Sequence, residues 1–205
     1  MEKIFQAIES LGGTQKNPVN TGEAQEFNMD ESVKKLEAMF ESKLPEEYIQ
    51  LQKKFGGFAF KNNIAVKALE EHPALDDSQA VSLNYFYGLE LDGDNSIHKK
   101  IRDYKDRIPS SFLPICPGEM NDLICIDLSP SNYGKICFWV SDIIPGEEEE
   151  TFLVQNNITD LFVNAYMEEE AEDDPDAPPV DYDDEKFKHL NPTLLEMLKK
   201  SKHSK

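Results

Sequence analysis

The stretch Leu44–Phe60, LPEEYIQLQKKFGGFAF, constrains the fold of this chain more than any other segment. Pro45 suits the first turn of a helix, because its missing amide N–H has no helical partner there and its φ is already helical. Apolar side chains then recur on one helical face at Tyr48, Leu51 and Phe55. The double glycine that follows ends the helix, and the FAF motif after it alternates as a strand does. The segment therefore predicts a capped helix that reverses into a sheet, and it carries no side chain suited to breaking a covalent bond.

Acidic residues dominate the charge of the chain. Its 205 residues include 40 acids and 21 bases, which gives a formal net charge of −19. Residues 168–205 hold 12 acids and 6 bases, a net of −6, so −13 remains on residues 1–167. A body of this charge repels nucleic acid and anionic membranes. The charge favours a basic protein partner, and it is equally consistent with a role in solubility alone.

The sequence also predicts where the protein resides and how its cysteines behave. No apolar run approaches the roughly 18 residues that span a bilayer, and the N-terminus lacks the basic and apolar blocks of a signal peptide. We therefore expect a cytoplasmic protein. Cys116, Cys125 and Cys137 lie in or beside apolar strand-like runs, which indicates reduced core residues. Their spacing, and that of the histidines, matches no metal motif, so we expect no metal or other cofactor.

Hydrophobic periodicity predicts a series of amphipathic helices. A short helix carries Ile4, Phe5, Ile8 and Leu11, and residues 14–26 form a polar connector. Asp30 is the expected N-cap of the next helix, whose inner face has Val33, Leu36, Met39 and Phe40. Further helices are expected over residues 97–108 and after Asn157.

Apolar alternation predicts the strands, which are Phe58–Phe60, Ile64–Val66, Val81–Tyr87, Phe112–Cys116, Leu123–Leu128, Ile136–Val140 and Thr151–Gln155. The first two are separated by a turn-prone spacer and are expected to form a hairpin. Residues 129–134 form a turn-rich loop, which predicts that the strands on either side of it are antiparallel.

The chain divides into three parts by composition. Residues 1–29 hold the first helix and the connector, and residues 30–167 hold the main domain. Residues 168–205 begin with an acidic segment, Glu168–Glu185, that has eleven acids, three prolines and no base. Such a segment predicts an extended or flexible linker. A short terminal helix with Leu194, Leu195, Met197 and Leu198 is expected either to dock on the body or to bind a partner.

Several motifs occur in an order that resembles the SUKH superfamily, which includes the fungal Smi/Knr cell-wall regulators and bacterial immunity proteins. The motifs are Leu44–Tyr48, Phe55–Gly57, Ile108–Pro109, Leu113–Ile115, Asn121–Leu128, Gly134–Trp139, Thr151–Phe152 and Ile158–Phe162. The resemblance covers roughly residues 30–167. The chain departs from the common pattern in having Phe55, rather than Asn, before the double glycine, and in the extra segment after residue 167.

The resemblance implies an α+β fold in which helices pack on a curved, mainly antiparallel sheet. It also implies a non-enzymatic immunity protein that binds a cognate basic toxin domain, of nuclease or deaminase type, and covers its active site. The alternative is an interaction scaffold of the fungal cell-wall-regulator type. The resemblance implies no cofactor, and the acidity excludes nucleic acid and membrane as partners. The oligomeric state is left open.

Individual residues suggest where a partner binds. Glu147, Glu148, Glu149 and Glu150 form an acidic run that could occupy the basic groove of a nuclease and steer its association. Tyr133 and Trp139 are core or turn residues first, and either would be an interface anchor if it were exposed. A hydrolase remains a third class, in which Asp122 and Asp127 would be paired carboxylates. Solvated strand ends account for these two aspartates better.

Overall fold

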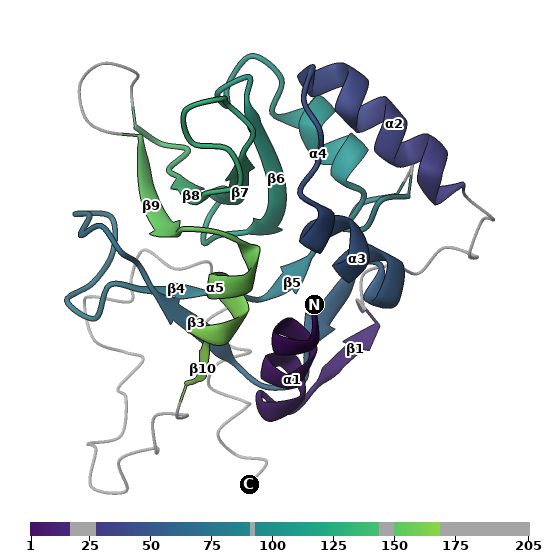
Figure 1. The fold of residues 1–205 in the computed structure, drawn as a ribbon. Helices are drawn as coiled ribbons and strands as arrows, with labels where there is room; N and C mark the ends of the chain where they lie inside the picture. The colour runs from purple at the N-terminus through teal and green to yellow at the C-terminus, as the bar shows by residue number, and fades with distance from the viewer. Residues whose placement is uncertain (17–27, 91–92, 144–149, 169–205) are drawn as a thin grey trace, which may run out of the picture. The chain divides into compact units, whose positions relative to one another are not determined.

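The structure is a computed structural model that describes residues 1–16, 28–90, 93–143 and 150–168. These residues belong to one compact unit, Met1–Glu169. Within them the helices are α1 (Glu2–Ser10), α2 (Met29–Phe40), α3 (Glu46–Phe55), α4 (Ile97–Asp103) and α5 (Ile158–Val163), as Figure 1 shows. The predicted terminal helix and the acidic segment from residue 169 lie outside the described residues.

The strands form three sheets rather than one. The largest has β6 (Phe112–Pro117), β7 (Leu123–Asp127), β8 (Ile136–Trp139) and β9 (Thr151–Gln155) in chain order. A second has the order β1 (Thr14–Lys16), β2 (Phe58–Phe60) and β5 (Tyr85–Phe86), and a third has β10 (Tyr166–Met167), β3 (Ile64–Lys67) and β4 (Ala80–Ser82). Neighbouring strands in these sheets are antiparallel, which confirms the predicted α+β class.

The segment around the double glycine folds as predicted. Helix α3 begins after Pro45, and its Tyr48 and Leu51 are fully buried. Gly56 ends the helix with φ +62°, a conformation that residues with a side chain rarely adopt. Gly57 has a different role, since a Cβ there would lie only 2.9 Å from the amide nitrogen of Gly88. The two glycines therefore serve separately as helix stop and as the point where two backbones meet.

The predicted hairpin between Phe58–Phe60 and Ile64–Val66 is wrong. Strand β2 pairs with β1 and β5, whereas β3 pairs with β4 and β10. Asn62 explains part of this crossover, because its side-chain amide donates to the Leu11 carbonyl at 3.0 Å and so turns the spacer toward α1. Residues 14–16 of the expected connector form β1, which shows that pairing with β2 overrides their polar composition.

The strand predicted over Val81–Tyr87 is likewise divided between two sheets. Its first part is β4, which pairs with β3, and its second part is β5, which pairs with β2. Leu83 lies between them and donates its amide to the Ile64 carbonyl at 2.7 Å. Chain segments on either side of a short break thus belong to different sheets, a feature that alternation alone does not reveal.

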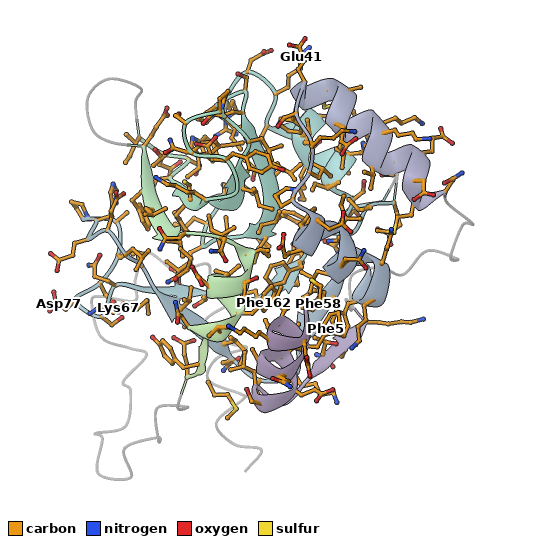
Figure 2. All side chains as sticks on the ribbon, viewed as in Figure 1. Phe5, Glu41, Phe58, Lys67, Asp77 and Phe162 are labelled. Atoms are coloured by element: carbon orange, nitrogen blue, oxygen red, sulfur yellow. The ribbon has the colours of Figure 1, made fainter. Side chains whose placement is uncertain are left out.

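Phe58 lies at the centre of the aromatic core. Its ring stacks on Phe86 with centroids 4.8 Å apart and lies 5.5 Å from Phe55 and 6.4 Å from Phe162. Figure 2 shows Phe58 and Phe162 in the interior, close to α1, which carries Phe5. These contacts join α3 and α5 to the sheet of β2 and β5. The cluster is thus an apolar connection between the N-terminal and C-terminal parts of the domain.

Helix α2 differs from its prediction in its cap and in its inner face. Asn28, rather than Asp30, is the N-cap, and its side-chain oxygen accepts the Glu31 amide at 3.2 Å. Val33 and Leu36 are buried as expected, but Met39 is 54% exposed.

A buried polar contact attaches α2 to α4, which lies beside it in Figure 1. The Ser32 hydroxyl donates to the Leu89 carbonyl at 2.6 Å and lies 2.7 Å from His98 Nε2. Because the single hydroxyl proton is directed at Leu89, His98 Nε2 is the donor in the second bond. Both side chains are buried, so this contact fixes how α2 sits on the body.

We predict that Phe58→Ala lowers the free energy of unfolding by about 3–5 kcal/mol, because it removes the ring at the centre of the cluster and leaves a cavity. Urea unfolding followed by circular dichroism measures the change. Met120→Ala is the control, since Met120 is 88% exposed and its loss should cost no more than about 0.5 kcal/mol. Equal stability of the two variants would contradict the central position of Phe58.

We predict that Ser32→Ala lowers the free energy of unfolding by about 1–3 kcal/mol, because it leaves the buried Leu89 carbonyl and the donor of His98 without this partner. The matched control is Ser42→Ala, whose hydroxyl makes a long contact of 3.4 Å with the neighbouring Lys43 carbonyl. Native-state hydrogen exchange should also show faster opening of α2 in Ser32→Ala. Unchanged exchange across α2 would rule out the role assigned to this contact.

Candidate functional site

The predicted acidic run lies mostly outside the described residues. Glu147, Glu148 and Glu149 belong to the segment that the structure does not describe. Glu150 is partly exposed, and its carbonyl accepts the Val140 amide at 2.9 Å. Glu150 therefore immediately precedes β9 and lies beside the end of β8.

Tyr133 is exposed on the turn between β7 and β8. Its side chain is 47% exposed. Asp127 organises the turn, since its carboxylate accepts the Ser129 amide at 2.8 Å and the Ser111 hydroxyl at 3.0 Å. Gly134 completes it with φ +85° and donates its amide to the Asp127 carbonyl at 2.8 Å. The turn therefore holds Tyr133 at the surface as an exposed aromatic side chain.

Trp139 does not reach the surface. It is 3% exposed, and its ring meets the edge of Tyr104 with centroids 5.7 Å apart and planes at 88°. The Arg107 guanidinium lies 5.8 Å from the indole. Trp139 thus packs within the domain, and Tyr133 is the one of the two predicted aromatic residues that is accessible to a partner.

Among the predicted binding residues that the structure describes, Trp139 and Glu150 lie at one end of β8 and Tyr133 lies at the other. Register pairs Ile136 with Gln155 and Trp139 with Thr151, so Tyr133 precedes one end of β8 and Glu150 lies beside the other end. At about 3.3 Å per residue, a strand keeps its two ends well apart. Tyr133 and Glu150 therefore lie near opposite ends of β8.

The acidic neighbours of Tyr133 come instead from α2 and α3. Partial burial raises the pKa of Tyr133, and the negative charges of Glu37 and Glu47 raise it further. Glu47 is exposed on the first turn of α3, where a carboxylate is favoured by the helix dipole. The sequence gives no signal for this grouping, because Tyr133 is far from both acids along the chain.

The turn between α2 and α3 holds Glu37 in position. The Glu37 carboxylate accepts hydrogen bonds from the Lys43 ammonium at 2.7 Å and from the Leu44 amide at 3.3 Å. Glu41 ends α2 in the left-handed conformation, and Figure 2 shows its side chain directed away from the body. An open hollow of about 360 Å³ lies here, lined by Lys34, Glu37, Ala38, Glu41, Ser42 and Lys43. The hollow is accessible, and its lining holds two glutamates and two lysines.

The two candidate catalytic aspartates have structural partners. Asp127 is 4% exposed and organises the Tyr133 turn, and the Asp122 carboxylate accepts the Ser141 amide at 2.7 Å. The interpretation as a solvated strand end is therefore wrong for Asp127, which is buried. Asp122 is partly exposed just before β7, which agrees with that interpretation. The Ser32 hydroxyl likewise has a structural role, because it donates its proton to the Leu89 carbonyl.

The three cysteines are free, as predicted. Cys125 and Cys137 are directly opposite each other on β7 and β8. Burial raises the pKa of Cys116 to about 12 and that of Cys137 to about 12, so both thiols are protonated at neutral pH. Within the described ranges, no group of three or more His, Cys, Asp or Glu side chains is arranged to hold a metal ion. Nor does any helix in this part of the chain have the length and apolar character needed to cross a membrane.

We predict that the protein loses stability as pH rises above about 9, with Cys116 contributing. Its pKa is raised from an ordinary value of 9.0, so above that pH the unfolded thiol ionises while the folded one stays neutral. Below pH 9 the thiol is neutral in both states and its contribution is constant. Urea midpoints measured from about pH 7.5 to about pH 10.5 should fall less steeply with rising pH in Cys116→Ala than in the wild-type protein. An identical slope in both proteins would contradict this assignment.

Comparison with known proteins supports the resemblance drawn from the sequence. The model of the SMI1 / KNR4 family (SUKH-1) matches residues 29–164. The chain is also 30% identical to the SPbeta prophage-derived uncharacterized protein YokK of Bacillus subtilis (strain 168), over 171 residues that cover 76% of this chain and 85% of that protein. The matched region begins at α2 and ends just after α5, so it includes Tyr133 and both of its acidic neighbours.

Proposed function

Because the chain belongs to the SMI1 / KNR4 family (SUKH-1), we propose that it is a cytoplasmic immunity protein. It binds a cognate toxin domain of nuclease or deaminase type and neutralises it by covering the active site. The family match over residues 29–164 is the observation that carries this proposal, since bacterial proteins of this kind typically act in this way.

The charge of the chain fits such a partner. A domain that acts on nucleic acid must attract phosphate, so its substrate groove is basic. A protein with a net charge of −19 is drawn to that groove by the same field that draws the substrate. Opposed charges mainly raise the association rate and select the partner, while buried apolar contacts supply affinity. Tyr133 is the exposed aromatic side chain best placed to supply such a contact.

Binding without catalysis fits the polar groups described above. Asp122 and Asp127 hold loops, Ser32 and His98 join two helices, and the buried thiols are protonated at neutral pH. These groups are used to build surfaces rather than to present a nucleophile or a base. The proposed action therefore requires only occupation of the toxin's groove.

A scaffold of the fungal regulator type is the second candidate, and one observation favours it. Val163, Tyr166 and Met167 are 50%, 41% and 51% exposed at the end of α5 and on β10. Strand β10 forms the edge of its sheet, with β3 on its inner side. An apolar edge of this kind is a second surface on which another protein could dock, and a scaffold needs more than one such surface.

We predict that this protein rescues cells from a toxin encoded beside its gene. The test expresses the C-terminal toxin domain of the neighbouring gene for a long secreted protein, with and without this chain. Growth should be restored, and the two purified proteins should elute as one complex. Growth arrest that persists at equal expression of the two proteins would contradict the immunity function.

Association kinetics of the same pair test the role of charge. The on-rate should fall as salt is raised from low to high concentration, because screening shortens the reach of the acidic field to about 3 Å at 1 M. A stable complex whose on-rate ignores salt would contradict electrostatic steering while leaving the immunity function in place.

A further inference from the structure

The turn between β6 and β7 presents the most exposed large apolar side chain in the described part of the chain. Met120 is 88% exposed, whereas the next in order, Met39, is 54% exposed. A side chain with so little contact to the body adds little to the stability of the fold. Single exposed apolar residues are ordinary, but the backbone that carries this one is not.

The backbone at Met120 has a conformation that favours glycine. The Asp122 amide donates to the Glu119 carbonyl at 2.9 Å, which closes a turn of four residues. Met120 is the second residue of this turn and has φ +60°, whereas Asn121, the third, has no positive φ. This is the pattern of a type II′ turn, in which glycine is favoured at the second residue. A long apolar side chain is thus held where a residue without one would be less strained.

Contacts with the body hold this turn in place. The Gly118 amide donates to the Asp122 carbonyl at 2.8 Å, and the Asp122 carboxylate accepts a hydrogen bond from the Ser141 amide at 2.7 Å. A Cβ on Gly118 would lie 2.6 Å from the Phe138 ring, so the backbone of the turn rests directly on a core aromatic residue. Met120 is therefore presented on a braced turn, which limits the backbone freedom that is lost on binding.

Strand register brings this turn and the residues that follow β8 to the same end of the four-stranded sheet. Leu123 at the start of β7 pairs with Trp139 at the end of β8, and Trp139 pairs with Thr151 at the start of β9. The Val140 amide donates to the Glu150 carbonyl at 2.9 Å at this end. We call this end the Met120 corner, and its described residues are 118–122, 140–143 and 150.

The Met120 corner is acidic around its apolar tip. Its four acids are Glu119, Asp122, Asp142 and Glu150. None of the corner's described residues is a lysine or an arginine. The nearby Arg107 guanidinium lies 5.8 Å from the Trp139 ring, outside the corner. An apolar contact within a charged rim is the usual anatomy of an interface hot spot, and an acidic rim is complementary to a basic one.

We propose that Met120 inserts into an apolar pocket on the basic surface of the toxin domain, with the acids of the Met120 corner facing the basic rim of that pocket. This inference rests on the proposed function for its partner, and it adds the residue that supplies an apolar contact. Methionine suits this role, because its unbranched, polarizable side chain adapts to an irregular pocket.

This contact is compatible with a contact at Tyr133. The four residues of β8 separate its two ends by roughly 13 Å, at about 3.3 Å per residue. A standard interface covers about 800 Å² on each partner. One toxin domain is therefore large enough to contact both ends of this strand.

The first test locates the toxin domain on the full chain. Trp139 is the single tryptophan and lies at the same end of the sheet, so replacing tryptophan with 5-fluorotryptophan gives one ¹⁹F resonance that reports on the Met120 corner. The unlabelled toxin domain of the neighbouring gene is the probe. We expect the resonance to shift when this domain is added. A resonance that stays unchanged in a complex verified by gel filtration would overturn the contact.

Variants then separate the side chain from the turn. Met120→Asn accepts a positive φ but lacks the apolar group, so the affinity for the toxin domain should fall at least about tenfold, mainly through faster dissociation. Met120→Leu keeps an apolar side chain and should retain most of the affinity. Met39→Asn is the matched control, since Met39 is exposed on α2 outside the corner, and it should bind as the wild type does. Urea midpoints verify that all three variants are folded.

The outcomes separate this inference from the immunity function. Unchanged affinity in Met120→Asn would overturn the contact, while the immunity function would stand. Equal losses in Met120→Asn and Met39→Asn would also overturn it, because the effect would not be specific to the corner. Failure of the wild-type chain to bind the toxin domain would contradict the proposed function and, with it, the partner named for this contact.

Discussion

The packing of Phe58 against Phe55, Phe86 and Phe162 is the contact on which the rest of the domain depends. It joins the end of α3 and the last turn of α5 to a small sheet whose strands come from distant parts of the chain. Removing these rings from water supplies much of the free energy that orders the surrounding helices. Because Phe55 at the end of α3 packs in this cluster and Tyr48 and Leu51 are buried, the first turn of the helix, with Glu47, is fixed as well.

The candidate surface is assembled from three elements that are anchored separately. Helix α3 is held by the aromatic cluster, α2 is held to α4 by the bond between Ser32 and His98, and the turn of Tyr133 is held by Asp127. None of these anchors is itself exposed to a partner. Buried polar groups with satisfied bonds thus position an exposed ring and two carboxylates without taking part in binding. This arrangement suits a protein whose function is to present a shape and a charge.

Local features of the fold could be predicted from the sequence, whereas pairings between distant segments could not. Pro45, the double glycine and the spacing of Tyr48 and Leu51 determine α3 by local conformational preference. The antiparallel pair β7–β8 follows from two apolar runs and the turn between them. The crossover at Asn62 and the strand β1 depend instead on partners elsewhere in the chain, and short strands carry little information about which partner they choose.

The same distinction applies to the surface. The exposure of Tyr133 follows from a turn that the sequence indicates, but Glu37 and Glu47 join it only through tertiary packing. Tertiary packing also decides the burial of Trp139. This residue lies next to a loop, but Tyr104 and Arg107 cover it. Hydrogen exchange of the full chain, alone and bound to the toxin domain proposed as its partner, tests the central claim most directly. The account predicts slower exchange at the turn of Tyr133 and at the start of α3 in the complex. Slower exchange confined to other surfaces, with these two segments unchanged, would contradict it.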